Sequence, residues 1–212
     1  GFGVFSLKAG LISTRHVVHT PDGNIIGEWG IRKWVQSDKR KPPTKTNVHI
    51  ARQALRLALL EQLVGTNSVQ WNHHFLNYKE TNNNTIALNF TVNGTPKSAT
   101  ANLIVGADGI RSYVRQQLIG DGASPLRYLD CIVILGICPL SALQNNESDL
   151  LDSATVFQTA NGNERMYIMP FNKDSVMWQL SFPMLESEAK DLSAQGKKAL
   201  KKEAIRRTQW HH

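Results

Sequence analysis

The sequence predicts a mixed α/β protein with α+β character, built from a β-meander and a second, mainly antiparallel sheet. Apolar residues recur at three- and four-residue spacing over 49–63, which is typical of an amphipathic helix. Short apolar runs separated by Asn-Gly and Asp-Gly turn signals lie on both sides of that helix. A Gly- and Asp-rich break at 120–125 separates regions of different composition, so we predict domains over 1–123 and 124–212.

Composition narrows the class of protein. The 212 residues carry a net charge of +7, much of it in clusters at 39–41 and 197–207. No aromatic residues are interleaved with these clusters, so we predict a solvated basic face and no nucleic-acid partner. No apolar run approaches the roughly 20 residues that cross a bilayer, and no leader pattern opens the chain. We therefore expect a cytoplasmic protein without a transmembrane segment.

Cysteine and histidine spacing favours neither a disulfide framework nor a metal site. Cys131 and Cys138 stand apart from any other cysteine, so we predict buried free thiols. His73 and His74 are neighbours on a predicted strand and therefore point to opposite faces. No spacing of the Cys-x-x-Cys or His-Glu-x-x-His type occurs, and we predict that no metal is bound.

The first part of the chain reads as β structure. Val4–Leu7 is a predicted short strand, and Ile12–Thr20 and Asn24–Trp29 flank a Pro-Asp-Gly-Asn turn signal. This pattern predicts a hairpin. The polar, Pro-containing stretch Gln36–Asn47 is predicted to be a loop.

The predicted helix His49–Leu63 carries a basic residue near its start. Arg52 lies at the positive end of the helix dipole, which is unfavourable unless an anion lies opposite. The alternative is a solvent-facing arginine whose stem covers the core. Gly65 is a plausible stop signal. The residues of the predicted apolar face are Ile50, Ala54, Leu55, Ala58, Leu59 and Leu63.

After the helix, Ser68–Tyr78, Thr85–Val92 and Lys97–Val105 are predicted strands of a meander, with Asn93-Gly94 as a hairpin turn. The last strand would end at Gly106-Ala107-Asp108-Gly109 and pass directly into a helix over 112–118. Backbone amides and a helix start favour an anion, and a carboxylate there can accept from ribose hydroxyls. The alternative is an ordinary strand–turn–helix corner with a surface aspartate.

The remaining residues predict an antiparallel sheet followed by a helix. Tyr128–Pro139 is rich in Ile, Val and Leu, and β-like stretches with short turns between them follow it. A basic helix is predicted over 192–207, interrupted by Gly196. The β-like stretches are Ala154–Thr159, Arg165–Pro170 and Ser175–Phe182.

The segment 103–115 resembles the Asp-Gly segment of FAD-dependent aromatic-ring monooxygenases, the p-hydroxybenzoate hydroxylase-like family. That motif is an apolar strand, Asp-Gly, two variable residues, Ser, one variable residue and Val-Arg. Arg52–Leu55 is similar to the family's Arg-x-x-Leu helix start. Arg165–Trp178 resembles its substrate-domain strands, and Trp210-His211 resembles the segment after its long helix. The residues that supply the Asp-Gly motif are Asp108, Gly109, Ser112, Val114 and Arg115.

The resemblance implies a partial FAD/NAD(P)-binding domain, including an early substrate-domain hairpin, and a substrate-binding sheet over 124–212. Asp108 would hydrogen-bond the ribitol or ribose of FAD. The Asp108-Gly109 turn would lie near the NAD(P)H pyrophosphate, and Arg115 would support the turn. Arg52 would face the FAD pyrophosphate or ribityl chain. The strand at Phe75 would touch adenine through its backbone.

The implied activity is hydroxylation of an aromatic or related small molecule, with FAD as cofactor and NADPH or NADH as co-substrate. The sequence indicates no catalytic residue and no oligomeric state. It departs from the family in lacking a Gly-x-Gly-x-x-Gly opening and a later Gly-Asp segment. We therefore expect a truncated, internal portion of such an enzyme. The alternatives are a non-catalytic paralogue or binding module, and a different flavin or NAD(P)H oxidoreductase.

Overall fold

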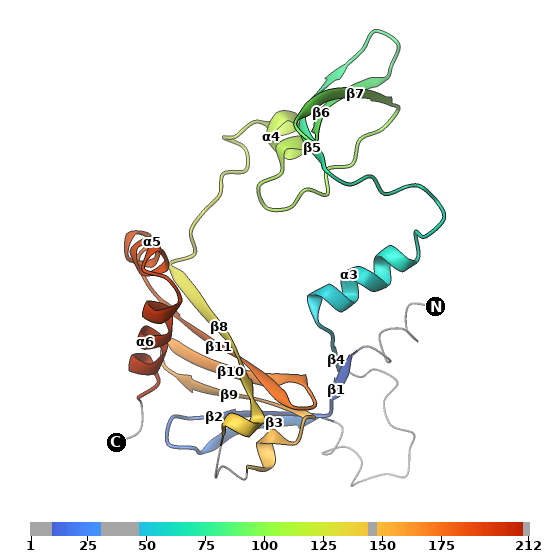
Figure 1. Cartoon of the computed structure of the whole chain (residues 1–212). Helices are drawn as coiled ribbons and strands as arrows, with labels where there is room; N and C mark the ends of the chain where they lie inside the picture. Colours follow the sequence, from blue (N-terminus) through green and yellow to red (C-terminus); the bar gives the residue numbers. More distant parts are fainter. Residues whose placement is uncertain (1–9, 31–46, 144–147, 210–212) are drawn as a thin grey trace. The chain divides into compact units, whose positions relative to one another are not determined.

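The computed structural model describes residues 10–30, 47–143 and 148–209. The chain forms two compact units, one from Gly1–Glu61 with Leu129–His212 and one from Gln62–Tyr128 (Figure 1). We call them the sheet unit and the meander unit. The predicted strand Val4–Leu7, most of the predicted loop Gln36–Asn47, and Trp210-His211 lie outside the described residues.

The sheet unit is built on six strands in the order β3-β2-β9-β10-β11-β8. All neighbours are antiparallel except β2 and β9, which pair in parallel. A separate ribbon joins β1 (Leu11–Ser13) to β4 (Asn47–His49). The six strands are β2 (Arg15–His19), β3 (Ile25–Gly30), β8 (Cys131–Pro139), β9 (Thr155–Asn161), β10 (Glu164–Asn172) and β11 (Ser175–Pro183).

The predicted hairpin is β2–β3, and its turn forms as the sequence indicates. Thr20 N donates to Asn24 O at 2.9 Å, and Gly23 takes a positive φ of 81°, which a glycine adopts without strain. The hairpin joins the later strands through the parallel pairing of β2 with β9. The compact units therefore divide the chain differently from the predicted boundary between 1–123 and 124–212, which stays a prediction about functional domains.

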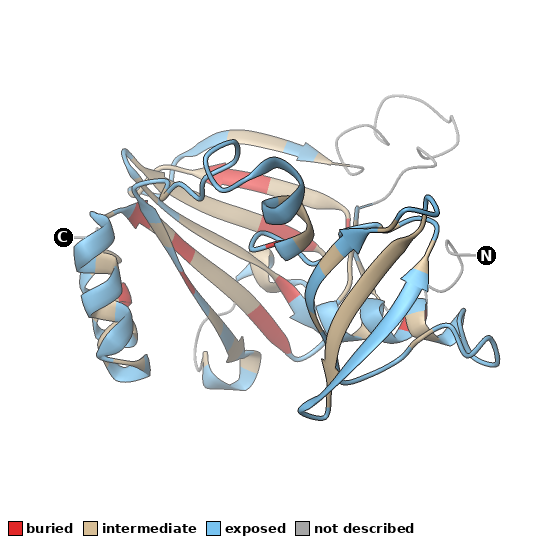
Figure 2. Ribbon diagram, turned by 90° about the horizontal axis from the view of Figure 1, so that it is seen from above, coloured by how far each residue is buried: buried red, intermediate tan, exposed pale blue. Residues whose placement is uncertain are grey.

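The six-stranded sheet has two different faces because successive side chains alternate. One face, which we call the helix face, packs against α6 (Lys197–Arg207), the helix that follows α5 (Glu186–Ala194). Figure 2 shows the buried positions on the strands of this sheet. Gly136 of β8 lies under the Trp178 ring, where a Cβ would come within 2.3 Å of ring carbons. The buried core of the helix face is Ile134, Leu180, Phe182 and Ala204.

The opposite face, which we call the open face, carries the alternate residues of the same strands. On β8 these are Val133, Leu135 and Ile137, which are 51%, 62% and 55% exposed. Across the register they continue through β11, β10, β9 and β2 to β3. The other strand positions of the open face are Trp29, His16, Val18, Gly27, Val156, Gln158, Ala160, Arg165, Tyr167, Met169, Met177, Gln179 and Ser181.

The predicted long helix is α3 (Arg52–Glu61), which is shorter at both ends than expected. Ala58 is buried as predicted, but Leu55, Leu59 and Leu63 are 37%, 44% and 42% exposed. The expected apolar face is therefore covered only in part by the described residues. Gly65 takes a positive φ of 83° in the turn after the helix.

The meander unit contains β5 (His73–Glu80), β6 (Ile86–Val92) and β7 (Thr95–Ala101) in that order. Asn93 and Gly94 form the predicted turn, both with positive φ. The expectation that the last strand reaches Val105 is wrong, since β7 ends at Ala101. Leu103 and Val105 are 75% and 77% exposed, and no described strand lies beside them to satisfy their backbone groups.

Helix α4 (Tyr113–Ile119) is attached to the edge of this small sheet by one side chain. The Gln117 side-chain amide accepts a hydrogen bond from Tyr78 N at 3.0 Å and donates one to Tyr78 O. It thus forms the two hydrogen bonds that the backbone of a neighbouring strand would form. Strand β5 is an edge strand, and this contact satisfies two of its free backbone groups. The α4 helix itself was predicted, and Ser112 is its N-cap.

Replacing Gln117 with leucine should loosen α4 from β5. We expect a loss of about 1 kcal/mol, because both hydrogen bonds to Tyr78 disappear while the helix propensity hardly changes. The Tyr78 amide should exchange its proton faster, while the amides between β6 and β7 keep their protection. Gln116→Leu, one residue away and exposed, is the matched control. Equal exchange at Tyr78 in both variants would contradict the docking role.

The last part of the chain differs in two ways from expectation. The basic helix is two helices, because Gly196 takes a positive φ of 82° between α5 and α6. Both cysteines are free as predicted, but Cys131 is exposed and Cys138 is partly exposed, so neither is a buried thiol. Two short 3-10 turns follow β8, at Leu140–Ala142 and Asp149–Leu151.

Among the described residues, no helix is long and apolar enough to cross a membrane. The same residues contain no cluster of histidine, cysteine or acidic side chains that could hold a metal ion.

Candidate functional site

The turn at 106–109 is shaped by two glycines with different tasks. A Cβ on Gly106 would lie 2.7 Å from Val114 Cβ, so only glycine lets this backbone approach α4. Gly109 has a φ of +84° and open space around its Cα, so it is needed for conformation. Together they bring the Asp108 side chain over the first turn of the helix.

The Asp108 carboxylate is bound from within the chain. Ser112 Oγ donates to its Oδ1, and the Tyr113 and Val114 amides donate to its Oδ2 at 2.7 and 3.4 Å. Ser112 Oγ in turn accepts from Arg115 N at 3.0 Å. Asp108 and Ser112 therefore share the free amides at the start of α4, as a paired N-cap.

These bonds also set the charge of Asp108. Its pKa lies below the ordinary value, chiefly because the Ser112 hydroxyl donates to the carboxylate, with the backbone amides of Asp108, Val114 and Tyr113 adding to the effect. The side chain is exposed, so it stays ionised at neutral pH.

The arrangement corrects one expectation. The amides at the start of α4 were expected to favour an external anion, but three of them already bind Asp108 and Ser112. The Asp108 side chain is nevertheless exposed, so its carboxylate is accessible to a donor from outside the chain.

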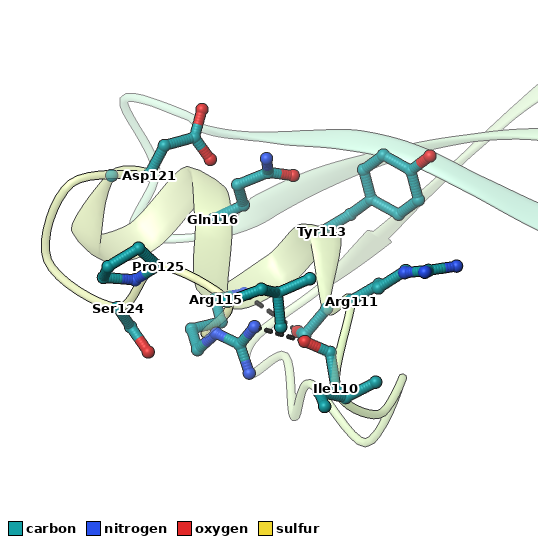
Figure 3. A pocket seen from close by; sticks show the side chains of 11 residues that line it. Ile110, Arg111, Tyr113, Arg115, Gln116, Asp121, Ser124 and Pro125 are labelled. Atoms are coloured by element: carbon teal, nitrogen blue, oxygen red, sulfur yellow. Dashed lines mark hydrogen bonds between the residues drawn. The ribbon is translucent and has the colours of Figure 1, made fainter. Parts of the chain in front are cut away.

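Arg115 holds the turn from the other side. Its guanidinium donates to Ile110 O at 2.5 Å (Figure 3). Arg111 and Arg115 are among the residues that line a cavity of about 510 Å³, together with the acidic Asp121. The other residues that line it are Ile110, Ser112, Tyr113, Gln116, Gly120, Ser124, Pro125 and Leu126.

The five predicted cofactor residues do not all lie in one unit. Asp108, Gly109 and Arg115 form the turn just described. Phe75 lies in the same unit on β5, with its ring 6.3 Å from that of Phe90 on β6. Arg52 is the exposed first residue of α3, in the sheet unit.

A second constellation, on the open face, was not found from the sequence. His16 of β2 stacks on Trp29 of β3, with ring centroids 4.2 Å apart, and meets Tyr167 of β10 edge-on at 5.8 Å. Burial raises the pKa of Tyr167. The hairpin signal could have placed His16 beside Trp29. Tyr167 joins them only because β2 pairs with β9, which no local pattern indicates.

The helix face has a cavity of its own, of about 420 Å³. Its wall is almost wholly apolar, so it offers few groups that could orient a ligand. The lining residues include Cys138, Phe157, Met166, Ile168, Val176 and Trp178.

A profile of the FAD binding domain family matches residues 29–211. A comparison with curated proteins found no significant match. Solved structures of flavoenzymes, by contrast, resemble the chain over most of its length.

The structure of Klebsiella pneumoniae HpxO complexed with FAD and uric acid has a TM-score of 0.65 at 18% identity, covering 88% of this chain and 44% of that one. Pseudomonas aeruginosa PqsL, a probable FAD-dependent monooxygenase, has a TM-score of 0.66 at 19% identity, covering 98% and 51%. A salicylate hydroxylase substrate complex has a TM-score of 0.65 at 18% identity, covering 88% and 45%. The chain thus has the fold of these proteins and spans about half of their length.

Proposed function

Because the chain belongs to the FAD binding domain family, we propose that it is part of a flavin-dependent monooxygenase that hydroxylates an aromatic or related small molecule. NADPH or NADH would supply the electrons. The observation that carries the proposal is the Asp108 turn, with its motif, its two special glycines and its exposed carboxylate. The fold shared with HpxO, PqsL and salicylate hydroxylase supports it.

In the meander unit, the exposed Asp108 carboxylate would accept a hydrogen bond from a sugar hydroxyl of FAD, and Gly109 would let the backbone approach the cofactor closely. Arg115 keeps the turn in place through Ile110 O. FAD, when bound, supplies the redox and oxygen chemistry, whereas the protein binds and orients.

The remaining assignments are proposals of the same kind. Arg52, exposed at the start of α3, would pair with the FAD pyrophosphate or approach the ribityl chain. The β5 backbone at Phe75 would touch the adenine ring. The sheet from Tyr128 to Phe182 would cover the flavin ring. The open face of this sheet would hold the substrate, and water would be excluded from the flavin and from the substrate.

The proposal is tested by titrating the purified chain with FAD and following the absorbance and fluorescence of bound flavin. We expect saturable binding with one flavin per chain. The loaded protein should then oxidise NADPH or NADH faster when phenolic compounds are added. No flavin binding by this chain, or by a longer chain that contains it, would overturn the proposal.

Replacing Asp108 with alanine should weaken FAD binding about tenfold, because a hydrogen bond to an ionised carboxylate is lost. Ser112→Ala is the matched control, since it removes the cap bond to Asp108 but keeps the carboxylate. It should weaken FAD binding less than Asp108→Ala does. The measurement is the Kd from flavin fluorescence. Equal FAD affinities for wild type and Asp108→Ala would remove the assigned role of that carboxylate.

A second candidate function is ligand binding without turnover. The same titration separates the two functions. Bound FAD without stimulated NADPH or NADH oxidation would favour the binding module.

A further inference from the structure

Strand β8 ends the six-stranded sheet and, within the part of the chain that the structure describes, has a neighbouring strand on one side only (Figure 1). It is nine residues long, near the upper limit for strands, and contains no charged residue. Its side chains Val133, Leu135 and Ile137 are exposed. A long, apolar edge with free backbone groups is a template on which a further strand can pair.

The free backbone groups of β8 can be identified from the ends of its pairing with β11. Met184 N donates to Asp130 O at 3.1 Å. At the other end, Leu140 N donates to Asp174 O at 2.8 Å. Both pairs continue the β8–β11 register, and in an antiparallel pair every second residue bonds to the partner strand. The even-numbered residues of β8 therefore bond to β11, and the odd-numbered residues direct their N–H and C=O groups to the free edge.

Pro139 agrees with this assignment. It is the last residue of β8 and odd-numbered, so its missing N–H lies on the free edge and removes no bond to β11. In the described part of the chain, no hydrogen bond uses the backbone groups of Val133, Leu135 or Ile137. These three residues thus offer donors and acceptors in the regular spacing that a neighbouring strand would use.

The other edge strands of the two larger sheets carry features that hinder such pairing. The β5 edge is occupied at Tyr78 by the Gln117 side chain. Strand β7 contains Pro96 and Lys97. Strand β3 contains Glu28, and its pairing with β2 has a bulge. Proline, charge and bulges are the usual means by which edge strands avoid other chains. Along β8 the only such feature is the proline at its last position.

The sequence of β8 also suits pairing with itself. Because the strand is uncharged, two copies would not repel each other along it. Antiparallel pairing about the central residue would place Leu135 opposite Leu135 of the second copy, and Val133 opposite Ile137 of the second copy. Residues that lie opposite each other share a face of the sheet, so both pairs would be apolar contacts. A two-fold contact of this kind is closed and ends at two copies.

We propose that β8 is an interaction surface for a second copy of this chain. The two β8 strands pair antiparallel about a two-fold axis at Leu135, and the two six-stranded sheets join into one continuous sheet. The odd-numbered residues of β8 form the hydrogen bonds between the copies. This inference goes beyond the proposed function, and the contact needs neither FAD nor NADPH.

The first test uses the unmutated whole chain. Sedimentation equilibrium should show a monomer–dimer equilibrium, and the Val133 and Leu135 amides should exchange their protons more slowly as the protein concentration rises. The Ile134 amide, which bonds to β11, should be protected at every concentration. A chain that stays monomeric up to about 100 µM would overturn the inference. A dimer in which the Val133 and Leu135 amides stay unprotected would overturn it as well.

The second test uses the position of Leu135 on the two-fold axis. Leu135→Lys should weaken the dimer about tenfold, because an apolar pair is lost and like charges face each other. Leu135→Glu should do the same. A mixture of the two variants places opposite charges face to face and should recover an affinity within a few-fold of wild type. Failure of the mixture to recover would exclude pairing about Leu135. Leu129→Lys, an exposed leucine outside β8, is the control and should leave the Kd unchanged.

The third test removes one backbone donor. Leu135→Pro deletes an N–H on the free edge, so it should abolish the dimer while urea unfolding of the monomer stays close to wild type. Gly136→Pro deletes an N–H that bonds to β11 and should destabilise the sheet. A Leu135→Pro chain that folds and still dimerises would overturn the inference.

The remaining occupant of this edge is a strand from a longer chain of the same protein. Such a chain would be monomeric, with its Val133 and Leu135 amides protected at every dilution. That result would also overturn the inference. The proton-exchange measurement decides the question without any substitution, so a variant that does not fold leaves the test intact.

Discussion

Phe182→Ala is expected to lower the free energy of unfolding of the sheet unit by about 3 to 5 kcal/mol. Phe182 is fully buried at the centre of the helix face, beside Leu180, Ile134 and Ala204 of α6. Removing its ring leaves a cavity between β11 and α6. It also removes the surface over which the Arg207 guanidinium lies, 3.8 Å from the ring centre.

The measurement is urea unfolding followed by a probe in the sheet unit, such as Trp178 fluorescence. Phe171→Ala is the matched control, because Phe171 lies at the end of β10 and is 39% exposed. Its loss should cost well under half as much. Phe182→Leu should fall between the two, since it keeps apolar volume and removes the aromatic face. A cost below about 1 kcal/mol for Phe182→Ala would show that α6 does not depend on this core.

Glu203→Gln is expected to lower stability by about 2 kcal/mol at neutral pH. The Glu203 carboxylate binds Arg206 at 2.7 and 2.8 Å and Arg207 at 2.7 Å. Arg207 also reaches Glu164 of β10 at 2.5 Å, so the group connects α6 to the sheet. The hydrogen bond from Arg206, followed by that from Arg207, lowers the pKa of Glu203 from 4.5 to about 2.

The sign of the pH dependence follows from that shift. A carboxyl whose pKa is lower in the folded state stabilises the fold fully above its unfolded value. The contribution of Glu203 is thus complete above about pH 5 and decreases as the pH falls from 4.5 towards 2. Wild type and Glu203→Gln should differ most at pH 7 and converge in acid. Glu186→Gln is the control, because its pair with Lys190 is exposed and should contribute little at any pH.

Local sequence patterns predicted the helices, strands and turns well where the signal lies within a few neighbouring residues. The Pro21–Asn24 and Asn93-Gly94 turns, the strands β9 to β11 and the capped helix at Ser112 are all found close to the predicted residues. In each case the signal is a turn residue, a cap or an alternation that acts within a few residues. The family suggested by the Asp108 segment is likewise confirmed by the family match over 29–211.

Predictions were less accurate where the structure depends on contacts with residues that are distant in the sequence. The run Leu103–Val105 has the composition of a buried strand, but Leu103 and Val105 are exposed, because a strand also needs a neighbour. Among the described residues of the predicted apolar face of α3, Ala58 alone is fully buried. The amides at the start of α4 were expected to favour an anion, and those of Tyr113 and Val114 bind the Asp108 carboxylate of the same turn.

By itself the sequence determined the family, the local elements and the Asp108 motif, because each depends on residues that are near one another in the chain. Only the tertiary structure decided that β2 pairs with β9, which brings His16 to Tyr167 and groups the first hairpin with the last strands. The tertiary structure also decided which face of the six-stranded sheet and which residues of α3 are buried. Such contacts join residues more than a hundred positions apart, and their stability comes from burial and pairing that no short stretch encodes.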